Sequence, residues 1–273
     1  MNLQPMYTKT ISGLARIANA FEQAHKENRP ALMPYYTLGY PDPETSMDVI
    51  CAIAEAGADL IELGVPFSDP LADGPSIQNS TQIALQQGMS VARCFEMMRE
   101  LRRRGVKQPL ILMGYMNPIL SYGIKRYVSD TVAAQADGLI VPDLPPEEAI
   151  CLEPSCKSYQ VALIYLLSPS SSAERMKQVA QRTTGFLYLT ALSGVTGARK
   201  DLAADLPAFA ARARVAAHTP TAVGFGISTA EQVRTVGKLA DGVIVGSALI
   251  DAVRKSKEPV KAAREFVRGL RGG

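Results

Sequence analysis

The sequence contains no tryptophan, and it has only 2 histidines and 4 cysteines among its 273 residues. The cysteines form no C-x-x-C pair and have no histidines at the spacing of a zinc site, which argues against both a zinc site and a disulfide framework. We therefore expect four free thiols, at Cys51, Cys94, Cys151 and Cys156.

Long hydrophobic runs are missing as well. The longest stretches without charge are residues 108–124 and 158–173, and both contain proline, glycine or repeated serine. They fall short of the roughly 20 apolar residues that a membrane-spanning helix needs. The amino terminus also lacks the basic cluster and apolar run of a secretory signal. We expect a cytoplasmic protein without a membrane segment.

A strong excess of one charge is absent too. The formal net charge is +3, and the basic residues are interleaved with acids except at Arg102, Arg103 and Arg104. This balance argues against a nucleic-acid-binding surface, and we interpret the short basic run as a solvated helix end. Hydrophobic residues make up 47% of the chain, which is enough for a substantial core.

A repeated segment reveals the architecture. A-D-L-I-E-L-G begins at Ala58, A-D-G-L-I-V-P at Ala136 and A-D-G-V-I-V-G at Ala240. These runs are apolar without alternation and are flanked by helical patterns, as expected of parallel strands covered on both faces. At roughly 30 residues per strand-helix unit, eight units fit the chain.

The pattern predicts a single (β/α)₈ (TIM) barrel over residues 1–273. An amphipathic helix over residues 11–25 precedes the first strand and should cover the amino-terminal end of the barrel. An open doubly wound sheet is the alternative. It is disfavoured because L-G-Y-P-D-P, and not G-x-G-x-x-G, follows the first strand. The eight expected strands are residues 31–37, 58–63, 109–114, 137–142, 161–166, 185–190, 220–225 and 241–245.

Acidic residues are concentrated in the segment I-E-L-G-V-P-F-S-D-P-L-A-D-G-P, residues 61–75. Glu62 lies within an apolar strand, where a carboxylate is costly unless it is paired, protonated or catalytic, so its pKa should be high. In a barrel, strand ends and the loops after them face the active site, so Glu62 and Asp73 should converge. The alternatives are a core ion pair for Glu62 and a turn or helix cap for Asp73. Asp69 is interpreted as structural.

This segment closely resembles the signature of the tryptophan synthase alpha chain family. Further similarities follow in chain order: P-Y-Y-T-L-G-Y-P at 34–41, L-M-G-Y-M-N-P at 112–118, V-P-D-L-P at 141–145, S-G-V-T-G at 193–197 and G-F-G-I-S at 224–228. The resemblance implies a lyase that cleaves indole-3-glycerol phosphate into indole and glyceraldehyde 3-phosphate.

By that resemblance, Glu62 matches the family's acid-base glutamate and Asp73 the aspartate that holds the indole nitrogen. Tyr188 matches a tyrosine near the active carboxylate, although an aromatic residue on a buried strand can equally be core. Asp143 matches an aspartate beside the family's mobile loops, and a helix cap is an equal alternative.

Two further sets of residues follow from the resemblance. The substrate phosphate should lie against glycine-containing turns late in the chain, where barrels often bind phosphate through backbone amides. The residues expected there are Gly197, Gly226, Gly246 and Ser247. The indole ring should lie in an apolar pocket, for which core packing is the alternative. Its expected residues are Tyr35, Tyr115 and Phe225.

The resemblance also implies a partner. A PLP-dependent beta chain receives the indole in an alpha2-beta2 heterotetramer, and the alpha chain itself needs no cofactor and no metal. The alternatives are a stand-alone lyase that releases indole, an isomerase of phosphorylated sugars or anthranilate derivatives, and a non-catalytic regulatory barrel.

The sequence departs from the family at Ala191 and Leu192, where a more polar pair is usual.

Overall fold

The computed structural model describes residues 12–190, 205–224 and 226–272. Within these ranges, the chain alternates between short parallel strands and helices, as the sequence predicts. No helix in the described ranges is long and apolar enough to cross a membrane. The four cysteines are free thiols.

Nine strand segments are hydrogen bonded in the order β5-β4-β3-β2-β1-β9-β8-β7-β6, and all the pairings are parallel. Their bounds are β1 (Ala31–Thr37), β2 (Ile61–Gly64), β3 (Leu110–Met113), β4 (Gly138–Ile140), β5 (Ala162–Ile164), β6 (Leu166–Leu167), β7 (Leu187–Thr190), β8 (Thr221–Gly224) and β9 (Gly242–Val245). All eight expected strands are present, and the fifth is divided into β5 and β6.

That division closes the barrel. β5 pairs with β4, whereas β6 pairs with β7, and only Tyr165 separates the two segments. One extended run of chain therefore bridges both ends of the sheet, which leaves no free edge. The open doubly wound alternative is wrong.

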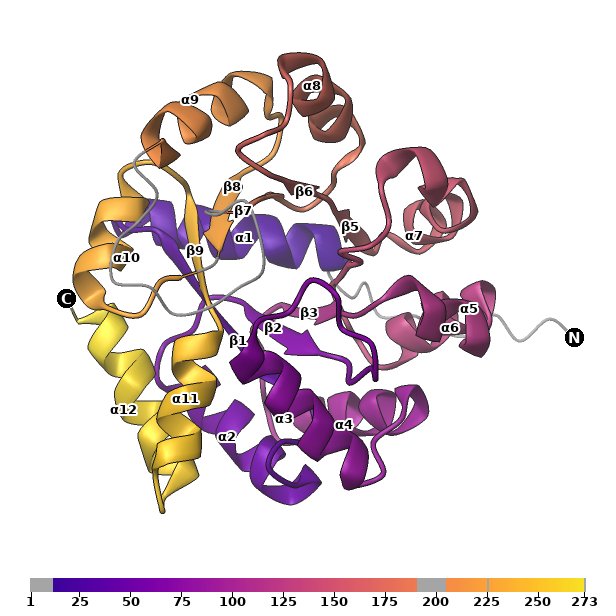
Figure 1. Ribbon diagram of the computed structural model, residues 1–273, viewed down its shortest axis with the longest axis vertical. Helices are drawn as coiled ribbons and strands as arrows, with labels where there is room; N and C mark the ends of the chain where they lie inside the picture. The colour runs from indigo at the N-terminus through magenta and orange to yellow at the C-terminus, as the bar shows by residue number, and fades with distance from the viewer. Residues whose placement is uncertain (1–11, 191–204, 225, 273) are drawn as a thin grey trace, which may run out of the picture.

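Helices surround the strands, as Figure 1 shows. Their bounds are α1 (Gly13–Lys26), α2 (Pro43–Glu55), α3 (Pro75–Gln86), α4 (Val91–Arg103), α5 (Met116–Tyr122), α6 (Ile124–Ala133), η1 (Pro146–Cys151, a 3₁₀ helix), α7 (Glu153–Tyr159), α8 (Ala173–Arg182), α9 (Leu206–Ala216), α10 (Ala230–Gly237), α11 (Ser247–Lys255) and α12 (Pro259–Arg271). The larger core cluster fills the space between these helices and the sheet.

Helix α1 covers the amino-terminal end of the barrel, as predicted. It begins after Ser12, whose hydroxyl accepts the Ala15 N–H at 3.3 Å. Ile17 and Phe21 are buried in the second core cluster, which consists largely of side chains that point into the barrel. Gly242 leaves room for this contact, because a Cβ there would lie 2.9 Å from the Phe21 ring.

The aspartates of the repeated A-D segments explain why that segment recurs. Each lies just before a strand and accepts the backbone N–H of a residue near the start of the neighbouring strand. The pairs are Asp59 with Leu32 (2.8 Å), Asp137 with Leu110 (2.8 Å) and Asp241 with Thr221 (2.7 Å). The aspartate of each repeat thus provides a hydrogen-bond acceptor for a backbone N–H group at the amino-terminal end of the barrel.

Candidate active site

Glu62 points into the barrel from the middle of β2. It pairs in register with Tyr35 of β1 and Ile111 of β3, and both of these belong to the interior cluster. Its neighbours Ile61 and Leu63 belong to the outer cluster. This alternation follows from the two-residue period of a strand, and it leaves the Glu62 side chain only 1% exposed.

Asp73 reaches the same interior from the loop after β2. Its N–H donates to the Pro70 carbonyl at 3.1 Å, and the Gln78 side chain donates to its carbonyl at 2.8 Å, so the backbone around it is fixed. Helix α3 has Gly74 as its N-cap and no side-chain cap. The helix-cap interpretation of Asp73 is therefore wrong, whereas the exposed Asp69 stays outside the pocket, as expected of a structural residue.

A pocket at the carboxyl-terminal end of the strands brings many of the expected residues together. Its lining comprises Tyr35, Glu62, Asp73, Ile77, Met113, Tyr188, Gly226, Ile227, Ile244, Gly246, Ser247 and Ala248. Gly197, Phe225, Ala191 and Leu192 lie outside the described residues. Tyr115 and Asp143 are not among the lining residues, although Tyr115 is hydrogen bonded with Asp73, which is.

The pocket also contains residues that the sequence reasoning missed. Ile244 and Ala248 lie in apolar runs and Ile77 is a single apolar residue in a polar segment, and nothing in the sequence distinguishes these pocket-wall residues from core residues. Met113 and Ile227 do lie within motifs quoted above, so their positions at strand ends are a signal that could have found them.

The two carboxyl groups have no counter-ion in the described part of the chain. No salt bridge there involves Glu62 or Asp73, and the Glu62 Oε2 atom is buried without a hydrogen-bond partner. The described residues thus provide no partner for the core ion pair that is the alternative for Glu62. An orphaned carboxyl oxygen that faces a pocket is expected of a group that meets its partner in a ligand.

Burial shifts both acids toward neutral pH. It raises the pKa of Glu62 to about 8, and the nearby Asp73 carboxylate contributes to the rise. Burial also raises the pKa of Asp73 to about 6, against the opposing effect of a hydrogen bond with Tyr115. Near pH 7, Glu62 is thus mainly protonated and Asp73 mainly ionised.

Two tyrosines are held against the strands by glycines. A Cβ at Gly64 would lie 2.0 Å from the Tyr35 hydroxyl, and one at Gly224 would lie 2.2 Å from the Tyr188 hydroxyl. Each glycine therefore provides the space in which a tyrosine lies next to the carboxyl groups. The pKa values of both tyrosines are raised well above normal, first by burial and then by the carboxylates.

Tyr115 and Asp143 make hydrogen bonds with the backbone of the loops after β2 and β3. The Tyr115 hydroxyl accepts the Ala72 N–H at 3.0 Å, next to Asp73. Asp143 accepts the N–H of Met116 at 2.9 Å and so caps α5, the helix that begins directly after Tyr115. The alternative from the sequence is that Asp143 caps the helix that follows it. That helix, η1, has no side-chain cap, so Asp143 caps a different helix from the one expected.

The opposite end of the pocket is built from main chain. Gly246 is the N-cap of α11, and Ser247 and Ala248 form the first turn of that helix. No lysine or arginine among the described residues lines the pocket. The free N–H groups and the dipole of a helix N-terminus favour an anion there without a cationic side chain.

The fold and the site agree with comparisons to known proteins. Residues 21–270 match the family model described as "Tryptophan synthase alpha chain". The chain is 48% identical to the tryptophan synthase alpha chain of Roseiflexus castenholzii over 95% of this chain and all of that protein. It resembles a solved structure of Mycobacterium tuberculosis tryptophan synthase with a TM-score of 0.88 at 35% identity, over 94% and 97% of the two chains.

A second solved structure agrees. The alpha subunit from Legionella pneumophila superposes with a TM-score of 0.84 at 37% identity, over 94% of this chain and 97% of that one. The family-model match begins within α1, ends within α12 and includes every described strand. The chain therefore belongs to the tryptophan synthase alpha chain family, and it is a lyase that cleaves indole-3-glycerol phosphate.

Proposed function

We propose that Glu62 and Asp73 divide the retro-aldol cleavage of indole-3-glycerol phosphate between them. The observation that carries this proposal is the pair of buried carboxyl groups that face one pocket and have no counter-ion within the described ranges of the chain. A decayed, purely regulatory barrel would have no reason to keep two such costly groups. Direct assay of the purified chain for indole and glyceraldehyde 3-phosphate is the primary test.

The chemistry follows from the two protonation states. Bond cleavage needs a proton on indole carbon 3, which Glu62 can donate because its pKa lies near 8. The ring nitrogen becomes cationic as that proton arrives, and the Asp73 carboxylate can stabilise the charge. Glu62, now ionised, takes the proton from the glycerol hydroxyl next to the scissile bond. The bond then breaks to give indole and the aldehyde.

The ends of the pocket would hold the ends of the substrate. Tyr35 and Tyr115, with Phe225, are proposed to contact the indole ring, and Tyr188 to position Glu62. The N-terminus of α11, at Gly246 and Ser247, is proposed to bind the phosphate together with Gly226 and Gly197. No cofactor is required in this scheme, because side chains and amides supply the acid, the base and the charge stabilisation.

Substitution of Gly226 tests the phosphate end. Gly226 lines the pocket and has φ +79°, a conformation that valine rarely adopts, so Gly226→Val should distort the backbone amides there. KM for indole-3-glycerol phosphate should rise at least about 10-fold, the loss expected for a hydrogen bond to a charged group. Gly105→Val is the matched control, since Gly105 has φ +92°, equally open surroundings and a place outside this pocket. Equal effects of the two variants on KM would contradict the assignment.

The pH dependence tests the division of roles. The lyase kcat/KM should rise as pH increases through about 6, where Asp73 ionises, and fall above about 8, where Glu62 loses the proton it donates. The measurement is kcat/KM from pH 5 to 9.5 in buffers of constant ionic strength. A rate that keeps rising above pH 8 would show that Glu62 is not required in the protonated form.

We further propose that a PLP-dependent beta chain docks on the active-site face, in an alpha2-beta2 assembly to which this chain passes indole. Three exposed apolar side chains support a partner there. Leu71, Leu120 and Ile150 are 83%, 55% and 74% exposed. They follow β2, β3 and β4, on the side where the pocket opens. Exposed apolar groups gathered on one face are typical of an interface.

Adding the cognate beta chain should increase the rate of indole formation about 5–150-fold, the usual range of coupling between subunits. Leu71→Asp with Ile150→Asp should weaken the complex and reduce this acceleration. Val215→Asp is the control, because Val215 is 89% exposed on α9, just before the amino-terminal end of β8. High activity alone, with no binding to a competent beta chain, would favour the stand-alone lyase. In either case we propose one domain that works in the cytoplasm.

A further inference from the structure

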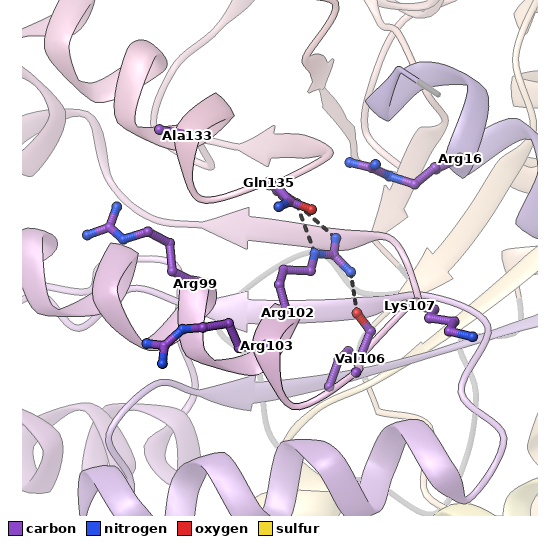
Figure 2. A pocket seen from close by; sticks show the side chains of 9 residues that line it. Arg16, Arg99, Arg102, Arg103, Val106, Lys107, Ala133 and Gln135 are labelled. Atoms are coloured by element: carbon purple, nitrogen blue, oxygen red, sulfur yellow. Dashed lines mark hydrogen bonds between the residues drawn. The ribbon is translucent and has the colours of Figure 1, made fainter. Parts of the chain in front are cut away.

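A hollow at the amino-terminal end of the barrel is strongly basic, and the lyase reaction does not use it. Figure 2 shows it from close by. Among the described residues 12–190, 205–224 and 226–272, nine line it, and they include five cations and no acid. They are Arg16, Arg99, Arg102, Arg103, Gly105, Val106, Lys107, Ala133 and Gln135. The loop between α4 and β3 contributes to the hollow and leads into the start of β3. The hollow therefore lies at the amino-terminal end of the barrel, whereas the Glu62 pocket lies at the carboxyl-terminal end.

Arg102 forms the framework of this hollow. Its Nη1 donates to the carbonyls of Val106 and Gln108 at 2.8 and 2.7 Å, and its Nη2 to the Gln135 carbonyl at 2.8 Å and to Asp137 at 2.7 Å. Its Nε also donates to Gln135, at 3.2 Å. All five N–H groups are thus used, and the side chain is only 9% exposed, unlike the solvated helix end that the sequence suggested. Arg102 fixes the walls, but it has no donor left for a ligand.

Asp137, which contacts two of the lining arginines, is already satisfied by its hydrogen bonds. One oxygen of Asp137 accepts from the Arg16 Nε, and the other accepts from Arg102 and from the Leu110 N–H. Asp137 has no exposed surface, so it cannot neutralise the remaining cations at the rim. Its contact with Arg16 joins α1 to the barrel and sets that guanidinium group at the edge of the hollow, as Figure 2 shows.

Several donors at the rim are available. Arg99 and Lys107 are exposed and have no ion-pair partner within the part of the chain that the structure describes. The terminal nitrogens of Arg16 are not used in its bond with Asp137. Arg103 shares the Glu100 carboxylate at 2.6 Å but is 74% exposed. The unpaired positive charges of Arg99 and Lys107 at one hollow concentrate anions there.

We propose that this hollow binds a small anion that carries more than one phosphate group. Guanidinium groups match phosphate oxygens in geometry as well as in charge. The donors come from separate elements, Arg16 from α1, Arg99 from α4 and Lys107 from the following loop, and a molecule with several phosphate groups can engage more of them than a single phosphate. No aromatic side chain of the part of the chain that the structure describes lines the hollow for base stacking, and this favours a small phosphorylated molecule over single-stranded nucleic acid.

Tripolyphosphate is the probe, with binding measured by isothermal titration calorimetry on the purified full chain. The double variant Arg99→Gln, Lys107→Gln should raise its Kd at least about 10-fold, because each lost charge-assisted hydrogen bond contributes strongly. Neither side chain has an ion pair to lose, so the fold should be unaffected. Lys125→Gln with Arg268→Gln is the matched control, since it removes the same two charges from exposed positions on α6 and α12 whose side chains have no ion pair among the described residues. The control should leave the Kd within about 2-fold.

The titrations are made in the Gly226→Val background as well, so that binding at the active-site phosphate position is counted separately. An unchanged Kd in the Arg99, Lys107 variant, or equal weakening in the control, would overturn the proposal. Orthophosphate that binds as tightly as tripolyphosphate would refute the requirement for several phosphates. A single-stranded oligonucleotide that displaces tripolyphosphate at lower concentration would show that the hollow is a nucleic-acid site. Arg99 and Lys107 lie outside the active-site pocket, so their substitution should leave lyase activity unchanged. The result of this test therefore does not depend on the proposed catalytic roles.

Discussion

Glu62→Gln is expected to reduce the kcat of indole-3-glycerol phosphate cleavage by at least about 10²-fold, the usual contribution of a general acid-base group. Glutamine preserves the size of the side chain but can neither deliver a proton to indole carbon 3 nor remove one from the glycerol hydroxyl. KM should change much less, because the phosphate and indole ends of the substrate are bound elsewhere in the pocket. Steady-state kinetics with indole as the measured product separates the two parameters.

Stability measurements provide the control for this variant. Burial raises the pKa of Glu62 to about 8, so the folded state binds its proton more tightly than the unfolded state does. The free energy of unfolding of the wild type should therefore decrease as the pH rises from the normal carboxyl pKa toward about 8. Glutamine does not titrate. The variant should therefore be at least as stable as the wild type at pH 7, and its free energy of unfolding should vary less between pH 5 and 8. A folded variant with nearly normal turnover would mean that Glu62 is structural.

The strands could be predicted because their residues are apolar on both faces, but their ends could not. Residues 58–60 belong to an apolar run, yet β2 begins only at Ile61, because Asp59 is occupied with Arg29 and the Leu32 N–H. The break between β5 and β6 has no local signal either. It occurs at Tyr165, whose N–H donates to Thr183 and whose hydroxyl donates to Glu153, and both partners are distant in sequence.

The site could be predicted where a residue conflicted with its surroundings. A glutamate in an apolar strand is costly, and this cost alone distinguishes Glu62 from the other residues of its strand. Ile244 and Ala248 line the same pocket but are ordinary apolar residues, so only the closed barrel reveals their position. Likewise, the sequence could not show that Asp143 caps α5, because the contact joins two different strand-to-helix loops.

Asp73→Asn is expected to lower kcat by about 10²–10³-fold, the effect typical of removing one group that stabilises transition-state charge. Asparagine is nearly isosteric and can still hydrogen bond the indole N–H, so KM should change little. What it lacks is the negative charge that offsets the cationic ring nitrogen. Asp69→Asn is the matched control, because Asp69 is an exposed aspartate of the same loop and should have no effect.

The pH profile of Asp73→Asn distinguishes a catalytic carboxylate from one that only supports the loop. The acid limb near pH 6 should disappear, because the group that ionises there is gone. The alkaline limb should move below about 8, because the Asp73 carboxylate contributes to raising the pKa of Glu62. It should nevertheless stay above the normal glutamate range, since burial is the larger cause and is unchanged. A variant that loses activity while both limbs stay in place would show that Asp73 acts through loop structure, with no electrostatic contact to Glu62.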